Sequence, residues 1–268
     1  MRLIGERQKM MILFVFVVCL CASTIGGICG IGGGVVIKPL LDATGIMSVS
    51  TVSFLSGLTV LAMSLISVYK NRKTKELDAR RSILLGLGAA VGGVMGKRLF
   101  EMIKQAAQAD QLVGMIQAIV LGLMVLGTLV YVRNKARIRT KDVSRASVAV
   151  VIGLLLGMCS SFLGIGGGPM NLAVLYYFFS MGTKQAAVNS ILIILMSQTM
   201  SLIMSLVTGS VPVFEMPVLL AMVCAGAIGG FVSAKLHRKL TAEMTDKLFS
   251  GLLVVILLIC CYNAVKWM

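Results

Sequence analysis

Apolar residues fall into ten runs along the chain, separated by short polar or charged stretches. Eight of these runs approach the length of about 20 residues that an α-helix needs to cross a membrane, whereas those at 35–46 and 169–181 are too short. The pattern predicts an all-α, polytopic membrane protein with about eight hydrophobic helical segments. In chain order the runs cover about 10–29, 35–46, 48–69, 82–100, 112–132, 146–163, 169–181, 185–208, 216–236 and 248–265.

Each short run directly follows a glycine-rich break, Gly-Ile-Gly-Gly-Gly, at 30–34 and again at 164–168. An unpaired backbone group in hydrocarbon costs several kcal/mol, so irregular backbone survives there only inside protein or along a cavity. We therefore expect a broken helix or a re-entrant hairpin at each break. Because the break is repeated, it is the best candidate for a binding site.

The two halves of the chain repeat one pattern. Residues 137 apart match at several places, among them Ser53 with Ser190, and the two glycine breaks lie 134 residues apart. Such near-constant offsets predict a two-fold internal repeat, with a first four-segment membrane repeat at 1–138 and a second at 139–268 in one membrane domain. Transporters are commonly built from such repeats, with the substrate site at the interface between them.

The relative orientation of the repeats depends on what the breaks do. If each break forms a hairpin that returns to its own side, each half crosses the membrane an odd number of times and the repeats are inverted. If the first segment of each half crosses fully, the repeats are parallel. The excess of Lys and Arg that marks cytoplasmic loops does not separate these arrangements, since both place 70–81 and 133–145 inside.

Composition agrees with a membrane protein, since 58% of the residues are hydrophobic and only 13% are charged. The formal net charge of +15 comes mainly from short loops between apolar runs, where Lys and Arg orient helices in the lipid bilayer. We therefore expect no nucleic-acid partner. The apolar run that begins near Met10 continues to Ile28 and joins the first break, so we interpret it as a retained first helix rather than a signal peptide.

Helices that start after the two breaks would point free N–H groups and a positive dipole end into the protein. Such an end attracts anions, and glycines let a ligand approach the backbone closely. Pro169 suits the first turn of a helix, where its missing N–H costs nothing. The alternative is that the glycines only permit close helix packing. The predicted anion-binding backbone is that of Gly32, Gly33, Gly34, Gly166, Gly167 and Gly168.

Polar side chains near the breaks are further candidates. Lys38 would add positive charge beside an anion, and Asp42, one helical turn later, would hold it in place or relay a coupling proton. The alternative is a local ion pair near an interface, with Lys38 reaching towards water. Uncharged donors would complete the shell of an oxyanion, although such residues also tie helices together. These candidates are Ser53, Asn171, Asn189, Ser190 and Gln198.

Enzyme chemistry finds little support in this sequence. The single histidine, His237, lies among basic residues, where we expect a solvated loop residue rather than a base. No spacing suits zinc or haem and no nucleotide-binding loop is present, so we expect no enzyme and no cofactor. Uphill transport would then run on a proton or sodium gradient. Cys29 and Cys159, beside the two breaks, support an alternative: a membrane thiol-redox or sulfur-relay protein.

The two Gly-Ile-Gly-Gly-Gly motifs, the prolines Pro39 and Pro169 after them and the four-segment repeats resemble the sulfite exporter TauE/SafE family of membrane permeases. The resemblance covers nearly the whole chain. It implies a multi-pass protein of the bacterial inner membrane that moves sulfite, an organosulfonate or a related small anion, with a homodimer as a candidate assembly. Pro39 lies five residues after Gly34, whereas Pro169 directly follows Gly168, so the two halves are expected to contribute unequally.

Overall fold

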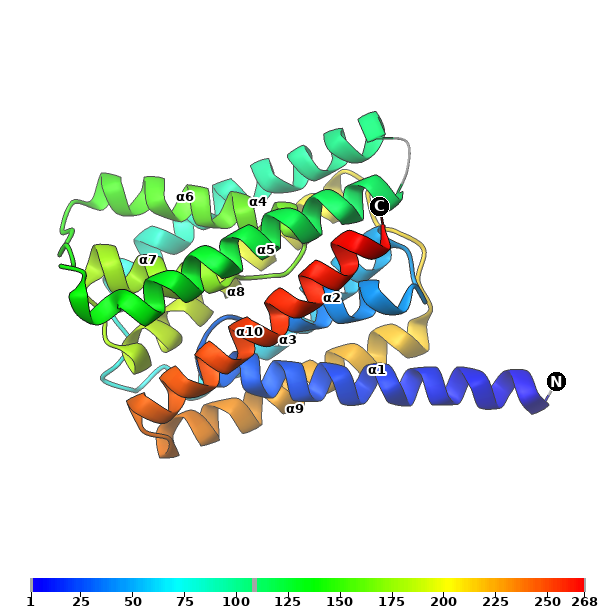
Figure 1. Ribbon diagram of the computed structural model, residues 1–268, viewed down its shortest axis with the longest axis horizontal. Coiled ribbons are helices and arrows are strands. Elements are labelled where there is room, and N and C mark those ends of the chain that lie inside the picture. Colours follow the sequence, from blue (N-terminus) through cyan, green and yellow to red (C-terminus); the bar gives the residue numbers. More distant parts are fainter. Residues whose placement is uncertain (1, 108–109, 268) are drawn as a thin grey trace.

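A computed structural model describes residues 2–107 and 110–267 of the chain, and these residues form helices joined by short connections (Figure 1). Eight of the described helices are long and apolar enough to cross a membrane, and this confirms the all-α membrane fold. In chain order the helices are α1 (Arg2–Cys29), α2 (Gly34–Thr44), α3 (Val49–Asn71), α4 (Ala79–Ala107), α5 (Asp110–Asn134), the 3-10 turn η1 (Lys135–Arg137), α6 (Ala146–Leu163), α7 (Pro169–Phe179), α8 (Thr183–Val207), α9 (Met216–Lys239) and α10 (Ala242–Lys266).

The two short helices, α2 and α7, return towards the side from which the preceding long helix came. The segment before α6 pairs with the end of α7, since Lys141 N donates to Tyr177 O at 2.7 Å and Val143 N to Phe178 O at 2.8 Å. In the first half, α1 and α3 both begin near the 208–215 loop. Each break is therefore a re-entrant hairpin, and the helices cross in the order that the inverted alternative requires.

The breaks turn because two glycines in each adopt the left-handed conformation. The φ angles are 78° at Gly30 and 79° at Gly32, and 63° and 69° at the matching Gly164 and Gly166. Residues with a Cβ rarely adopt this conformation, so the spacing of the glycines sets the path of both hairpins. The same turn is thus built twice, although α2 begins at Gly34 while the matching Gly168 is still extended and α7 begins at Pro169.

Helices of the first half pack mainly against helices of the second half (Figure 1). The first long helix of each half packs against the fourth element of the other half, α1 against α9 and α6 against α4. Likewise α3 packs against α9 and α8 against α4, while α5 meets α10 and α3 meets α8. If each helix is replaced by its counterpart in the other half, α1 by α6 and α4 by α9 for example, the same set of contacts results. Two related repeats would pack in this way, although the repeat itself stays a prediction.

Close approach of helix backbones explains many of the glycines outside the breaks. On α4, Gly88, Gly92 and Gly96 recur every fourth residue and face backbone carbonyls of α6, where a Cβ would overlap the oxygen. Small residues bring membrane helices together because van der Waals packing drives their association. The contact between α4 and α6 therefore joins the two halves firmly.

The basic loops gather at one end of the bundle. Arg81 Nη1 lies 3.0 Å from Asp142 Oδ1, and Lys135 Nζ lies 2.5 Å from Asp246 Oδ2. Arg238 also donates a hydrogen bond to the carbonyl of Lys70. These contacts bring the connections after α3, α5 and α9 together, and the opposite end carries the 208–215 loop.

Candidate functional site

The two glycine breaks lie directly against each other. A Cβ on Gly34 would overlap the carbonyl oxygen of Ile165, and a Cβ on Gly167 would lie 2.9 Å from the carbonyl oxygen of Ile31. Both isoleucines are fully buried. The two breaks therefore meet, and the stretches 32–34 and 166–168 pack backbone to backbone.

Several amide groups in this junction keep their protons free. Among the hydrogen bonds of the described residues, none uses the N–H of Gly33, Gly34, Gly166, Gly167 or Gly168. At Gly33 and Gly34 these are first-turn donors of α2, which have no acceptor within the helix. The sequence predicted free amides here, and Gly32 is an exception because its N–H donates to the carbonyl of Gly26 at 3.3 Å. A role of the free amides in binding stays a prediction.

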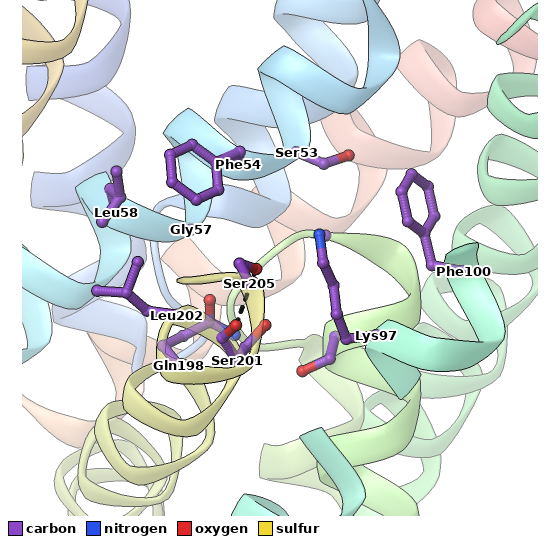
Figure 2. A pocket seen from close by; sticks show the side chains of 12 residues that line it. Ser53, Phe54, Gly57, Leu58, Lys97, Phe100, Gln198, Ser201, Leu202 and Ser205 are labelled. Carbon is purple, nitrogen blue, oxygen red and sulfur yellow. Dashed lines mark hydrogen bonds between the residues drawn. The ribbon is translucent and has the colours of Figure 1, made fainter. Parts of the chain in front are cut away.

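A cavity of about 30 Å³ lies beside the second break, between helices of both halves (Figure 2). This is room for one or two water molecules. Its position near the start of α3 and the end of α8 places it on the side of the 208–215 loop. It is lined by Ser53, Phe54, Gly57 and Leu58 of α3, Lys97 and Phe100 of α4, Ser161 and Gly164 at the end of α6, and Gln198, Ser201, Leu202 and Ser205 of α8.

Two of the side chains predicted for the site, Ser53 and Gln198, line this cavity. The hydroxyls of Ser53 and of Ser161 are buried and have no hydrogen-bond partner among the described residues. A third serine, Ser56, donates to the carbonyl of Gly164 at 2.8 Å and so ties α3 to the second break. The cavity therefore offers hydroxyl and amide donors beside the break.

The lining contains one cation, Lys97, which is not among the residues predicted for the site. Its half-buried side chain extends from α4 towards the α3 side of the cavity (Figure 2), and its Nζ lies 5.4 Å from the ring centre of Phe100. No ion pair among the described residues includes it. The sequence does contain a cue, because Lys97 is a lysine inside the apolar run 82–100. Since Arg98 follows it directly, the two residues look like the charges that flank the end of a membrane span.

The two predicted asparagines lie away from this cavity. Asn189 sits near the other end of α8, where Oδ1 accepts from Asp78 N and Ser82 Oγ and Nδ2 donates to two carbonyls, so its hydrogen-bonding capacity is used. Asn171, on α7, donates to Ser190 Oγ at 3.4 Å. In this conformation both residues hold helices and loops together.

Lys38 and Asp42 form the ion pair that their spacing suggested, with Lys38 Nζ 2.6 Å from Asp42 Oδ2. The picture of Lys38 reaching towards water is wrong, because Lys38 is only 2% exposed and Asp42 only 6%. The pair lies beside a second cavity between α2, α5 and α10, separate from the one that contains Lys97.

The expectation of a solvated His237 is also wrong. This residue lies within α9 and is 2% exposed, and its Nδ1 is 3.0 Å from the carbonyl of Ile28 just before the first break. The basic neighbours in the sequence hid this contact, because helix α9 turns His237 inwards. Cys29 is buried in the apolar core, Cys159 is half-buried, and both are free thiols.

Comparison with known proteins gives two matches. The model of a family described as "Sulfite exporter TauE/SafE" matches residues 15–259. The chain belongs to this family. A Bacillus subtilis (strain 168) protein named "Probable membrane transporter protein YunE" is 26% identical over 269 residues, which cover 92% of this chain and 96% of that relative.

Membership of the TauE/SafE family and the eight apolar helices make this chain a multi-pass membrane transporter. The match runs from α1 into α10 and so includes both hairpins and the whole lining of the cavity with Lys97, whereas Cys260 and Asn263 of the second cavity lie beyond it.

Proposed function

We propose that this TauE/SafE protein is a secondary permease for a small anion, namely sulfite, an organosulfonate or a related sulfur oxyanion, and that it works by alternating access in the bacterial inner membrane. The observation that carries the proposal is Lys97, a cation without an ion-pair partner among the described residues, in a cavity beside a glycine break. The family description supports the choice of a sulfur oxyanion.

Charge favours an anion at Lys97. An ionised side chain inside a membrane protein is costly unless it is paired or faces water, and such residues mark substrate pathways. A sulfur oxyanion would add negative charge in the cavity, beside that of Glu101 one helical turn along α4. An ammonium also makes charge-assisted hydrogen bonds, which are about twice as strong as neutral ones.

The neutral donors around Lys97 suit an oxyanion. The unpartnered hydroxyls of Ser53 and Ser161 and the amide of Gln198 would each donate to one of its oxygens. Because Gly164 lines the cavity, the free amides of Gly166 to Gly168 follow within a few residues. They would receive the anion when it moves past the second break.

Both halves contribute to the cavity, so a movement of one half against the other would change it. Helices α3 and α4 come from the first half, and α6 and α8 from the second. Both breaks are closely packed, because a Cβ on Gly30 would collide with Ala187 and a Cβ on Gly164 would collide with Ser53. With the basic loops in the cytoplasm, the cavity with Lys97 would lie on the outer side of the breaks.

The decisive experiment is transport by Lys97→Gln in proteoliposomes that carry radiolabelled sulfite. A hydrogen bond to a charged group contributes about 1.5–3 kcal/mol, so kcat/KM should fall by about 10- to 100-fold. The matched control is Arg98→Gln, which removes the same charge from an exposed neighbour and should leave transport unchanged.

Unchanged kinetics in a folded Lys97→Gln protein would remove the cavity from the mechanism. Competition by unlabelled sulfate, thiosulfate, an alkyl sulfonate and acetate would define the substrate class. If acetate competed as well as sulfite did, the assignment to sulfur oxyanions would be wrong.

A further inference from the structure

An apolar groove runs between α5 and α7, which come from different halves and pack side by side (Figure 1). Its volume is about 420 Å³. Met124, Gly127 and Tyr131 follow one another about one turn apart on α5 and form one wall, and Met170 and Val174 of α7 belong to the other. These walls do not suit a small oxyanion, because a charge that enters an apolar site loses its water without compensation.

The groove opens at the lipid-facing surface of the bundle. Gly127 is exposed, and a Cβ built on it would meet no other atom within 4 Å. Helix α5 is one of the spans long and apolar enough to cross the membrane, so this wall lies at the depth of the hydrocarbon chains of the bilayer. An acyl chain of a lipid therefore has the right chemistry to fill the groove.

One end of the groove lies at the level of the lipid headgroups. Aromatic rings gather there: the ring centres of Tyr131 and Tyr177 are 6.2 Å apart, and those of Tyr177 and Phe178 are 4.8 Å apart. Tyrosines are enriched where the hydrocarbon core of a bilayer meets the headgroups. A lipid whose acyl chain occupied the groove would thus place its headgroup beside the connection between α5 and α6.

Three exposed cations border this end of the groove. Arg137 and Arg139 flank Ile138, which lines the groove, and Lys141 Nζ lies 5.7 Å from the ring centre of Tyr177 in the same lining. None of the three takes part in an ion pair among the described residues. The only acidic residue at 133–145 already forms an ion pair with α4. Basic clusters in such positions attract the headgroups of anionic lipids.

We propose that the groove between α5 and α7 binds one acyl chain of an anionic phospholipid, whose phosphate is held by Arg137, Arg139 and Lys141. A zwitterionic lipid would fill the groove but brings no net charge to these cations. A second copy of the chain suits the groove less well. Two copies inserted in the same direction would meet with the same three cations at the same depth, and like charges repel.

The bound lipid would fix the position of the re-entrant helix α7. Met170 lies in the first turn of this helix, just after the second break, and Tyr177 lies near its end. One acyl chain would therefore pack along most of the length of α7. Because α7 has only 11 residues and cannot span the bilayer, a tightly held chain would replace part of the packing that a spanning helix obtains from its neighbours.

The test is lipid retention by the purified full-length protein in detergent. The protein is incubated with equal amounts of phosphatidylglycerol, which is anionic, and phosphatidylcholine, which is zwitterionic, and free lipid is removed by size-exclusion chromatography. Native mass spectrometry then identifies and counts the retained molecules. We expect one phosphatidylglycerol per chain, and about tenfold less phosphatidylcholine or lower still.

Gly127→Phe places a ring in the groove and should reduce retention of phosphatidylglycerol at least tenfold. The matched control is Gly251→Phe on α10, where a Cβ also meets no other atom within 4 Å and which lies outside the groove. This control should retain as much lipid as the wild type.

The charges are tested by the double variant Arg137→Gln/Arg139→Gln. A basic residue near the surface strengthens the attraction of anionic lipid about fivefold, so the preference for phosphatidylglycerol should fall about 25-fold. The control is Lys235→Gln/Lys239→Gln, which removes two exposed charges from the end of α9 and should leave the preference unchanged. Since Arg137 and Arg139 are exposed, this arm also decides the question if Gly127→Phe does not fold.

Equal retention of the two lipids by the wild type, or equal retention of phosphatidylglycerol by Gly127→Phe and Gly251→Phe, would overturn the proposal. Light scattering of the same samples measures the mass of the protein. A wild-type dimer that Gly127→Phe converts into a monomer would make the groove an interface between two copies, and this result would also overturn the assignment to a lipid.

Discussion

The α1–α2 hairpin and the α6–α7 hairpin share two left-handed glycines but differ in their chemistry. Both turn on two left-handed glycines at matching positions. After the first break α2 carries the Lys38–Asp42 ion pair, whereas the positions 134 residues later on α7 are Leu172 and Tyr176. The left-handed glycines are repeated, while the side chains that follow them differ between the two hairpins.

The surroundings of the two breaks differ in the same way. Gly164 of the second break borders the cavity with Lys97, and Ser56 holds its carbonyl. The matching Gly30 lies against the backbone of Ala187, and the counterpart of Ser56 in the second half is the apolar Ile193. The second break therefore borders the cavity with Lys97, and the first packs against the backbone of α8.

The largest effect is expected for alanine at two matching glycines, Gly34 and Gly168. A Cβ on Gly34 would overlap the backbone of Ile165. A Cβ on Gly168 would lie 3.7 Å from the nearest atom, Cδ1 of Ile165, which is an ordinary contact distance. Gly34→Ala should therefore cost about 3 kcal/mol of stability and greatly reduce the yield of folded protein, and Gly168→Ala should be tolerated. Size-exclusion profiles and thermal midpoints in detergent measure the folded yield and the stability of both variants. Equal losses in the two variants would contradict the difference between the two breaks.

An intermediate effect is expected at Asn189, whose counterpart in the first half is Val52. Asn189→Leu would leave the N–H of Asp78 without its acceptor and would free the loop that seals the basic end. A buried unsatisfied donor costs about 1–3 kcal/mol, so the melting midpoint should fall by several degrees. Asn134→Leu, at an exposed position on α5, is the matched control; an equal loss there would show that the loop contact is not the cause.

The smallest effect is expected for single hydroxyls. Ser161→Ala removes one donor from the cavity with Lys97 and should raise KM for the anion about fivefold, because a neutral hydrogen bond contributes about 1 kcal/mol. Ser67→Ala removes an equally buried and unpartnered hydroxyl that does not line this cavity and should leave KM unchanged. Transport kinetics in proteoliposomes distinguish the two, and a KM that rises in both variants would count against the cavity.

The hydrophobic pattern predicted the membrane fold and the place of both breaks, because segment length and glycine spacing are local properties that follow from bilayer thickness and backbone sterics. It left open whether each break is a broken helix or a re-entrant hairpin. It also predicted Ser53 and Gln198, which the structure places beside one cavity. It failed at His237, since periodicity does not tell which face of a helix end turns inwards. It overlooked Lys97 because a lysine near the end of an apolar run is usually a flanking charge.

Local sequence thus determined the number of spanning helices, the two breaks and the Lys38–Asp42 pair, whose members lie one helical turn apart. Only the tertiary structure decided that the breaks pack against each other and that α5 and α7, from different halves, form one apolar groove. Those contacts join residues far apart in the chain, and they depend on which helix faces meet. That choice is a property of the whole packed bundle, because each interface forms only when the other helices already hold their places.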